Sequence, residues 1–230
     1  MILGYYQPYL FPYIGYWQLM NIVDTFVIAD SVQHIKRGYI NRNNILINGQ
    51  RNMFTLEVLG VHQGMLINEI EVGRNAKKIL RSIFLAYKKA PYFEEVFPMI
   101  EQILLNDEKN LAKYVGYSIE RIACYLDMDT KFIYESDLPQ DTSLKAQDTI
   151  IEICKRFNAD HYINAIGGQV LYDKDDFLKE GIVLNFLKTG DIKYKQFNNE
   201  FVPNLSIVDV LMFNTKGEIK EMLTKYTLIV

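Results

Sequence analysis

Four clusters of polar, aromatic and glycine residues carry most of the side chains in this sequence that could bind a ligand. The first cluster, QPYLFPYIGYW, runs from Gln7 to Trp17. Its prolines fix the turn, Gln7 offers both a hydrogen-bond donor and an acceptor, and Tyr13 combines a stacking face with a hydroxyl. Such groups suit a sugar or a base, so we expect Gln7 and Tyr13 to face a ligand pocket. The alternative is that these aromatic residues pack as core beneath a loop.

The second cluster runs from Asp30 to Asn43 and combines positive charges with amides. Guanidinium groups and amide donors together suit phosphate, while the Asp30 carboxylate could hold Mg²⁺ or accept a hydrogen bond from a hydroxyl. A solvated basic loop is the ordinary alternative, but this loop should share one sheet edge with the first cluster, which favours binding. The residues that we expect to contact substrate here are Asp30, Lys36, Arg37, Asn41 and Arg42.

The third and fourth clusters supply glycines and a helix start. Gly167 and Gly168 follow a strand-like segment and let the backbone approach a ligand closely, although neither GxGxxG nor GxxxxGK[ST] occurs. A tight strand-to-helix turn is an equally good interpretation of these glycines. In the fourth cluster, Ser206 and Asp209 have capping-box spacing and are expected to cap a helix, while Asn204 is expected to face the pocket.

The sequence indicates no catalytic residue and no metal site. Its three histidines are far apart and no HExxH or CxxC spacing occurs, so we expect no dedicated metal site. Cys124 and Cys154 fall within apolar helical patterns, and we interpret both as buried thiols rather than as a disulfide pair. No Ser-His-Asp or Cys-His pairing can be assembled, which argues against a covalent hydrolase.

Three short apolar segments, each followed by a polar or glycine-containing loop, must position these clusters. The segments Ile2–Tyr6, Thr25–Ile28 and Tyr162–Ala165 have the length and composition of buried strands. A helix predicted at Tyr13–Met20 joins the first two into a βαβ unit, whose strands lie parallel. Ligands bind outside the carboxyl ends of such strands. The residues that should therefore meet at one edge are Gln7, Asp30 and Gly167.

The remaining segments predict additions to this sheet. Asn48-Gly49 between two strand-like runs, Asn44–Ile47 and Met53–Val58, predicts a β-hairpin. Asn75–Leu126 has helical periodicity, interrupted by Pro91 and Pro98. Further elements are expected as a strand at Lys131–Tyr134, a helix capped by Ser143 and running to about Phe157, a strand at Ile182–Phe186, a helix at Ile207–Phe213, and a short helix with a tail over Gly217–Val230. The prediction is a single α/β domain over residues 1–230: a Rossmann-like parallel sheet with flanking helices, a β-hairpin appendage and a helical middle segment.

Composition and charge narrow the classes of function. The 230 residues are 49% hydrophobic and carry a net charge of -3, so no overall basic field would gather nucleic acid. The apolar runs are shorter than the roughly 18 to 20 residues that a bilayer span needs. The N-terminal residues lack the pattern of a secretion signal, so we expect a cytoplasmic protein without a membrane span. The oligomeric state is left open.

Five blocks of the chain resemble one bacterial family, the WbqC-like proteins. They follow one another in order over nearly the whole chain, which makes the resemblance specific. The blocks are QPYLFPYIGYW at Gln7–Trp17, VDTFVIADSVQHIKRGYINRN at Val23–Asn43, APYF at Ala90–Phe93, YINAIGG at Tyr162–Gly168 and FVPNLSIVDVLMFN at Phe201–Asn214.

The resemblance implies a role in the biosynthesis of O-antigen and other surface polysaccharides. It suggests a transferase that acylates the amino group of a nucleotide-linked sugar, for example with glycine. In that hypothesis Lys36, Arg37 and Arg42 hold the phosphates, and Gln7, Tyr13 and Asn41 orient the sugar or base. A non-catalytic nucleotide-sugar binding protein is one alternative. A second is an ATP-dependent activating enzyme, because the loop around Pro12–Tyr16 resembles the start of nucleotidylyl-transferase domains; ATP or Mg²⁺ is then the cofactor to test.

Overall fold

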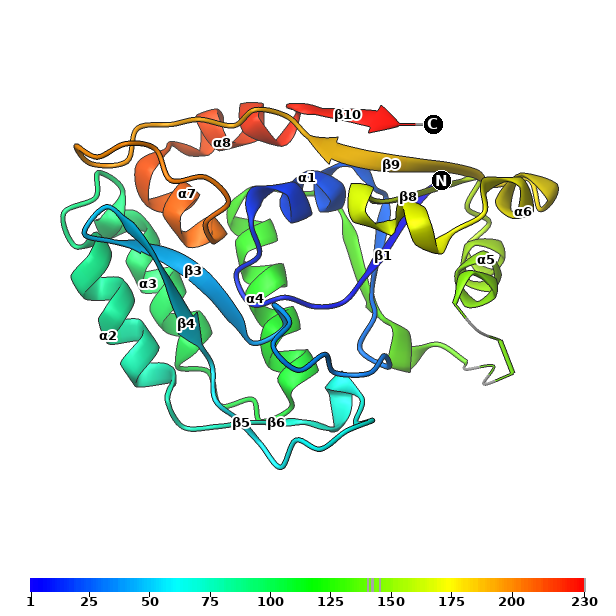
Figure 1. The fold of residues 1–230 in the computed structure, drawn as a ribbon, viewed down its shortest axis with the longest axis horizontal. Helices are drawn as coiled ribbons and strands as arrows, with labels where there is room; N and C mark the ends of the chain where they lie inside the picture. The colour runs from blue at the N-terminus through cyan, green and yellow to red at the C-terminus, as the bar shows by residue number, and fades with distance from the viewer. Residues whose placement is uncertain (140, 142, 145, 230) are drawn as a thin grey trace.

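A six-stranded sheet forms the centre of the computed structural model, which describes residues 1–139, 141, 143–144 and 146–229 (Figure 1). Its strands are β1 Ile2–Tyr6, β2 Thr25–Ile28, β7 Lys131–Tyr134, β8 His161–Ala165, β9 Val183–Thr189 and β10 Tyr226–Ile229. They lie in the order β10-β9-β8-β1-β2-β7. Every neighbouring pair from β9 to β7 is parallel, and β10 joins β9 antiparallel.

The order of the parallel strands confirms the predicted Rossmann-like arrangement. After β1 the chain adds β2 and β7 on one side, and then returns to add β8 and β9 on the other. This is the doubly wound order, and it creates a switch point between β1 and β8, where the connections leave in opposite directions. The three strands predicted to be parallel are confirmed, with Leu3 opposite Thr25 in β2 and Tyr162 in β8.

Helices cover both faces of the sheet because side chains alternate along its strands. The helices are α1 Ile14–Ile22, α2 Ala76–Tyr87, α3 Phe93–Leu104, α4 Leu111–Tyr125, α5 Gln147–Arg156, α6 Lys174–Lys179, α7 Ile207–Phe213 and α8 Lys216–Leu223. Leu3 and Val27 pack in a core with side chains of α5 and α6. Phe26 and Ile28 point to the opposite face and pack in the larger core, which contains side chains of α1, α4 and α8.

The predicted hairpin is confirmed, with its first strand two residues longer at the start and its second strand shifted toward the turn. Strands β3 Arg42–Ile47 and β4 Gln50–Thr55 pair antiparallel around Asn48 and Gly49, whose φ angles are 51° and 74°. Positive φ at both central residues is what the twist of a two-residue hairpin requires. A second small sheet, β5 Val58–Leu59 with β6 Glu71–Val72, and the short 3₁₀ helices η1 Ile67–Glu69, η2 Glu135–Asp137 and η3 Ile166–Leu171 were not predicted.

Several local predictions were wrong. Pro98 lies inside α3, whereas Pro91 does separate α2 from α3. Ser143 does not cap α5, because its hydroxyl and amide bond to Asp141 and the helix begins only at Gln147. Cys124 is exposed on α4, and only Cys154 is buried. The expected C-terminal tail is strand β10, which pairs with β9; Val230 lies outside the described residues.

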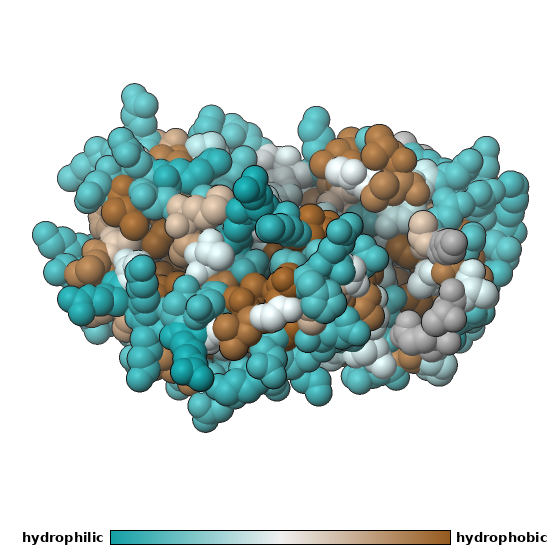
Figure 2. All heavy atoms as spheres, turned by 60° about the horizontal axis from the view of Figure 1, so that its bottom comes forward, coloured by the Kyte–Doolittle hydropathy of each residue, from teal (hydrophilic) through white to brown (hydrophobic). Residues whose placement is uncertain are grey.

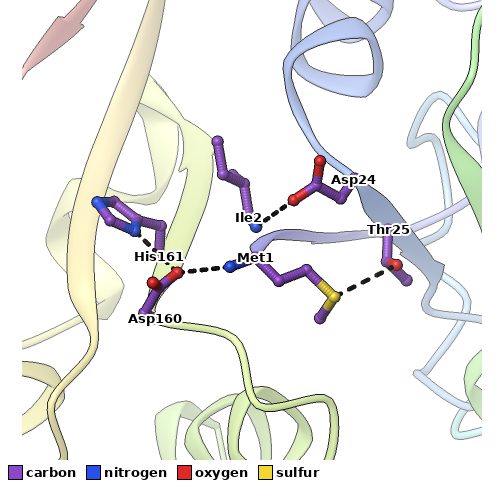
Figure 3. Close-up of polar contacts among 6 residues, drawn as sticks. All are labelled: Met1, Ile2, Asp24, Thr25, Asp160 and His161. Carbon is purple, nitrogen blue, oxygen red and sulfur yellow. Dashed lines mark hydrogen bonds and ion pairs between the residues drawn. The ribbon is translucent and has the colours of Figure 1, made fainter.

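At the amino ends of the strands, two carboxylates hold the start of β1 between its neighbours (Figure 3). Asp24 accepts a 2.7 Å hydrogen bond from the Ile2 amide, and Asp160 accepts one of 2.7 Å from the Met1 amino group. Bonds from that amino group and from His161 hold the pKa of Asp160 below its usual range. This edge of the sheet is therefore occupied by structural contacts, and the opposite, carboxyl edge is the one left for a site.

Candidate functional site

The carboxyl ends of β1 and β8 diverge around a cavity of about 320 Å³, called here the switch-point cavity. Its lining includes Tyr5, Gln7, Tyr9 and the pair Gly167 and Gly168. The chain enters η3 at these glycines directly after β8. This is the crevice in which doubly wound sheets bind their ligands. The structure thus brings together three of the residues that the sequence predicted.

Asn164, the buried residue at the end of β8, holds the turn into the glycines. Its amide nitrogen donates to the hydroxyls of Tyr162 and Tyr172, at 2.8 and 3.2 Å. Its oxygen accepts a 2.6 Å bond from the Ala165 amide. A Cβ at Gly168 would lie 3.2 Å from the Asn164 side chain, so a larger residue would crowd this turn. A side chain at this position would press against the Asn164 amide that holds the turn beside the cavity.

A second cavity of about 500 Å³, the tyrosine cavity, lies next to the first. Its lining includes Tyr9, Tyr13 and Tyr39 together with the cations Arg51 and Lys188. Because Tyr9 lines both cavities, we call the two together the cleft. The predicted residues Tyr13 and Asn204 belong to this second cavity. The cleft thus combines aromatic faces, amides, exposed glycine backbone and two positive charges.

The tyrosines of the cleft contact one another as well as the cavity. The ring centroid of Tyr9 lies 5.7 Å from that of Tyr6, 5.6 Å from that of Tyr16 and 6.4 Å from that of Tyr39. Burial raises the pKa of Tyr9 and of Tyr6. Their hydroxyls therefore stay protonated at neutral pH and can donate hydrogen bonds to a ligand.

The loop between β1 and α1 is held in place by side chains that are distant in sequence. The Asn43 amide nitrogen donates to the Phe11 carbonyl at 2.7 Å, and the Ser206 hydroxyl donates to the same carbonyl at 2.9 Å. The Trp17 indole donates to the Pro12 carbonyl at 3.0 Å. At Gly15, a Cβ would clash with the Thr189 hydroxyl and the Tyr13 ring. Only glycine lets α1 pass this close to the end of β9.

The cationic loop lines a third cavity, of about 710 Å³, called here the basic cavity. The predicted residues Lys36, Arg37, Asn41 and Arg42 all line it. The Asn41 amide nitrogen is already bonded to the Leu56 carbonyl at 2.7 Å. The structure therefore places the predicted phosphate-binding cations in a different cavity from Gln7, Tyr13 and the glycine pair.

Figure 2, turned so that the side of β5 and β6 comes forward, shows a largely hydrophilic surface with hydrophobic residues gathered near its middle.

Asp30, predicted as a magnesium ligand or hydroxyl acceptor, is buried at the end of β2. Its carboxylate accepts from the Ser136 amide at 2.9 Å and from the Ser136 hydroxyl at 2.6 Å. Within the part of the chain that the structure describes, no three His, Cys, Asp or Glu side chains are grouped so that they could hold a metal ion. Asp30 thus connects β2 to the segment after β7 and lines none of the three cavities described here.

A model of the WbqC-like protein family matches residues 7–221. The chain belongs to the WbqC-like family. This chain is also 28% identical over 222 residues to the "Uncharacterized protein Rv1507c" of Mycobacterium tuberculosis. The aligned region covers 94% of this chain and 95% of that protein. No solved structure was found to match this chain.

Three of the five sequence blocks that resemble WbqC-like proteins meet at the cleft. The block at Gln7–Trp17 forms the loop after β1 and the first turn of α1, and Tyr162–Gly168 forms most of β8 and the glycine turn. Phe201–Asn214 brings Asn204 to the tyrosine cavity and continues as α7. Among the described residues of the chain, no helix is both long and apolar enough to cross a membrane.

Sequence reasoning missed two groups at the site of this WbqC-like protein. The first group is Arg51 with Lys188, which come from β4 and β9 and line the same cavity. They do so only because the hairpin folds against the loop at Pro203, where the Arg51 guanidinium donates to the Pro203 carbonyl at 2.6 Å. The second group is the pair Tyr5 and Glu135, in which the Tyr5 hydroxyl donates a 3.0 Å hydrogen bond to the Glu135 carboxylate. Burial raises the pKa of this carboxyl. No local sequence pattern marks either contact.

Proposed function

We propose that this WbqC-like protein binds a nucleotide-linked amino sugar in the cleft and transfers an acyl group, such as glycyl, to the sugar amine. The observation that carries the proposal is that two neighbouring cavities share Tyr9 in their linings at the switch point of a doubly wound sheet. Small-ligand sites are typically cavities of about 300 to 1,000 Å³ that are lined by a few convergent polar groups, and both cavities fit this description.

The charges and ring faces of the cleft match the parts of such a ligand. A diphosphate carries negative charge and would lie in the tyrosine cavity, where Arg51 and Lys188 are positive. The Arg51 guanidinium is already oriented by its bond to Pro203. Tyr13 and Tyr39 are partly exposed there and can stack on a base or on the CH face of a sugar.

The amine of the sugar would then enter the switch-point cavity, where Tyr5 is in contact with Glu135. Acyl transfer forms a bond between the amine nitrogen and the acyl carbon, breaks the bond to the leaving group of the donor, and releases one proton. Glu135 can accept that proton through the Tyr5 hydroxyl, because burial raises the pKa of Glu135 and makes it a better base. Gln7 and the backbone at Gly167 can orient the sugar beside this pair.

Calorimetric titration with UDP-glucosamine, a nucleotide sugar with a free amine, tests the binding step. Wild type should bind, and Lys188→Ala should bind at least about tenfold more weakly, because one charge-assisted bond to phosphate is lost. Lys89→Ala, which removes an exposed lysine after α2, is the matched control and should bind like wild type. Equal binding by Lys188→Ala and wild type would place the phosphates elsewhere.

Mass spectrometry of the reaction mixture separates transfer from binding alone. With UDP-glucosamine and an activated glycyl donor, the proposal expects a product heavier by one glycyl group. A run with free glycine, ATP and Mg²⁺ tests the ATP-dependent alternative, for which phosphate or pyrophosphate release should accompany the product. Binding without any product in these runs would instead favour a non-catalytic nucleotide-sugar binding protein.

A further inference from the structure

The basic cavity combines several positive groups with no acidic residue in its lining. Lys36, Arg37 and Arg42 contribute formal charges, and His34 and His62 contribute imidazole rings. The whole chain carries a net charge of -3, so this local excess of positive charge does not reflect a generally basic surface. Such a cavity attracts anions and disfavours cations.

These cations are not neutralised inside the protein. Among the ion pairs formed by the described residues, none involves Lys36, Arg37 or Arg42. Like charges on one short loop repel one another, and this repulsion is offset when an anion binds between them. The Arg37 backbone has a φ of 64°, a conformation that costs free energy for a residue other than glycine.

Arg42 is held ready for a ligand. Its Nε donates a 2.7 Å hydrogen bond to the Gly38 carbonyl, and its guanidinium carbon lies 6.0 Å from the centre of the Tyr39 ring. These two contacts fix the plane of the guanidinium group and leave its Nη edge as the part that can form a two-pronged bond to phosphate. A fixed guanidinium loses little entropy on binding an oxyanion.

Two chain segments that are hydrogen-bonded to each other line the cavity. The His34 amide donates to the Met65 carbonyl at 2.9 Å, and the Ile67 amide donates to the Val32 carbonyl at 3.0 Å. Gly64, in the second segment, has a φ of 91° and open space where a Cβ would stand. The backbone beside it is therefore accessible from the cavity. Backbone hydrogen bonds hold the two segments together, so the cavity is a built part of the fold.

We propose that the basic cavity is a second ligand site, which binds a group of two or three linked phosphates on a molecule other than the sugar ligand. It shares no lining residue with either cavity of the cleft. Three cations, one of them held in place by two contacts, fit an oligophosphate better than a single phosphate. If the cleft binds the acceptor sugar, as the proposed function holds, the natural occupant is the phosphate-bearing part of the acyl donor or of the nucleotide that activates it.

Calorimetry with sodium tripolyphosphate tests the site directly. Wild type should bind, and Arg42→Ala and Lys36→Ala should each bind about tenfold or more weakly. Arg42→Lys should recover only part of the loss, because lysine lacks the planar fork. Arg81→Ala and Lys89→Ala are the matched exposed controls and should bind like wild type. Thermal melting of every variant verifies that each is folded. Wild-type affinity in both folded variants would overturn the proposal.

A competition experiment decides whether the two sites are separate. Tripolyphosphate is titrated into protein saturated with UDP-glucosamine, and the affinity should change by less than about twofold if the sites are independent. Mutual exclusion would overturn the second site and make the basic cavity the phosphate subsite of the sugar ligand. Loss of tripolyphosphate binding in wild type, with UDP-glucosamine binding intact, would overturn this inference and leave the proposed function standing.

The same titration with ATP distinguishes a free oligophosphate from a nucleotide. Tighter binding of ATP than of tripolyphosphate would support a nucleotide-bearing donor, since the base and ribose then add contacts. Equal binding would support recognition of the phosphates alone. In either case the Arg42→Ala variant must lose affinity, and a variant that binds ATP like wild type would contradict the site.

Discussion

The Tyr5 hydroxyl donates a 3.0 Å hydrogen bond to Glu135, and this bond joins the end of β1 to the segment after β7. Tyr5 faces the switch-point cavity, whereas Glu135 is buried behind it. Burial raises the pKa of Glu135, and bonds from Tyr5 and from the Ser31 backbone partly offset this rise. The raised pKa of Glu135 should therefore make the free energy of unfolding depend on pH.

Glu135→Gln should change how stability depends on pH. In the folded protein the Glu135 carboxyl keeps its proton to higher pH than in the unfolded chain, where its pKa is about 4.3. Wild type therefore loses stability as the pH rises from the unfolded pKa through the folded pKa. The glutamine does not titrate, so the stability of the variant relative to wild type should increase over that interval and then stay constant. Urea unfolding at several pH values measures this difference.

Tyr5→Phe is the matched variant for that measurement. It removes the hydrogen bond that favours the ionised carboxylate, so the pKa of Glu135 rises further. The loss of stability with rising pH should then be larger than in wild type. If wild type, Glu135→Gln and Tyr5→Phe give parallel curves, the carboxyl of Glu135 has the same pKa in both states and the burial argument fails.

Ser206→Ala should lower the free energy of unfolding by about 0.5 to 2 kcal/mol, the usual range for losing a helix N-cap. The Ser206 hydroxyl accepts a 3.2 Å bond from the Val208 amide at the start of α7. The Phe11 carbonyl, to which it also donates, keeps its bond from Asn43. Affinity for UDP-glucosamine should be nearly unchanged.

Thr215→Ala is the comparison for Ser206→Ala, since Thr215 caps α8 with a full capping box. Both variants should lose similar stability and neither should lose binding. Normal melting of Ser206→Ala combined with lost binding would show that Ser206 contacts the ligand instead of capping α7.

Asp209→Ala should be more damaging than either cap variant. The buried Asp209 carboxylate accepts from the Tyr87 hydroxyl at 2.7 Å, the Tyr194 hydroxyl at 2.7 Å and the Gln196 amide at 2.6 Å. Alanine leaves these buried donors without their acceptor, and we expect a loss of about 3 kcal/mol or more in urea unfolding. Tyr194→Phe removes a single donor and should cost about 1 kcal/mol. Similar small losses in both variants would contradict the network.

Local signals were sufficient to predict the framework of the fold. Short apolar segments that end in loops predicted β1, β2 and β8, and Asn48-Gly49 predicted the hairpin. Strand β10 was missed because Tyr226–Ile229 is a short edge strand whose identity depends on pairing with β9. The two-residue strands β5 and β6 carry too few residues to show any period.

The site could be predicted only in part, because proximity in space depends on tertiary contacts. Gln7 and the glycines at 167 and 168 were found from the rule that ligands bind at the carboxyl ends of strands. Arg51 and Lys188 line one cavity only after the hairpin folds against the loop at Pro203, and nothing in their own segments marks that arrangement. The Ser206 cap is confirmed, but Asp209 bonds to distant tyrosines and a glutamine instead of closing a capping box.

A structure of the protein in complex with UDP-glucosamine would show whether the cleft is the ligand site. We expect the diphosphate in the tyrosine cavity within hydrogen-bonding distance of Arg51 or Lys188, and the sugar amine in the switch-point cavity near the Tyr5 hydroxyl. The basic cavity at Arg42 should remain free of this ligand. A diphosphate bound at Lys36 and Arg42, or a ligand bound away from the carboxyl edge of the sheet, would contradict the account.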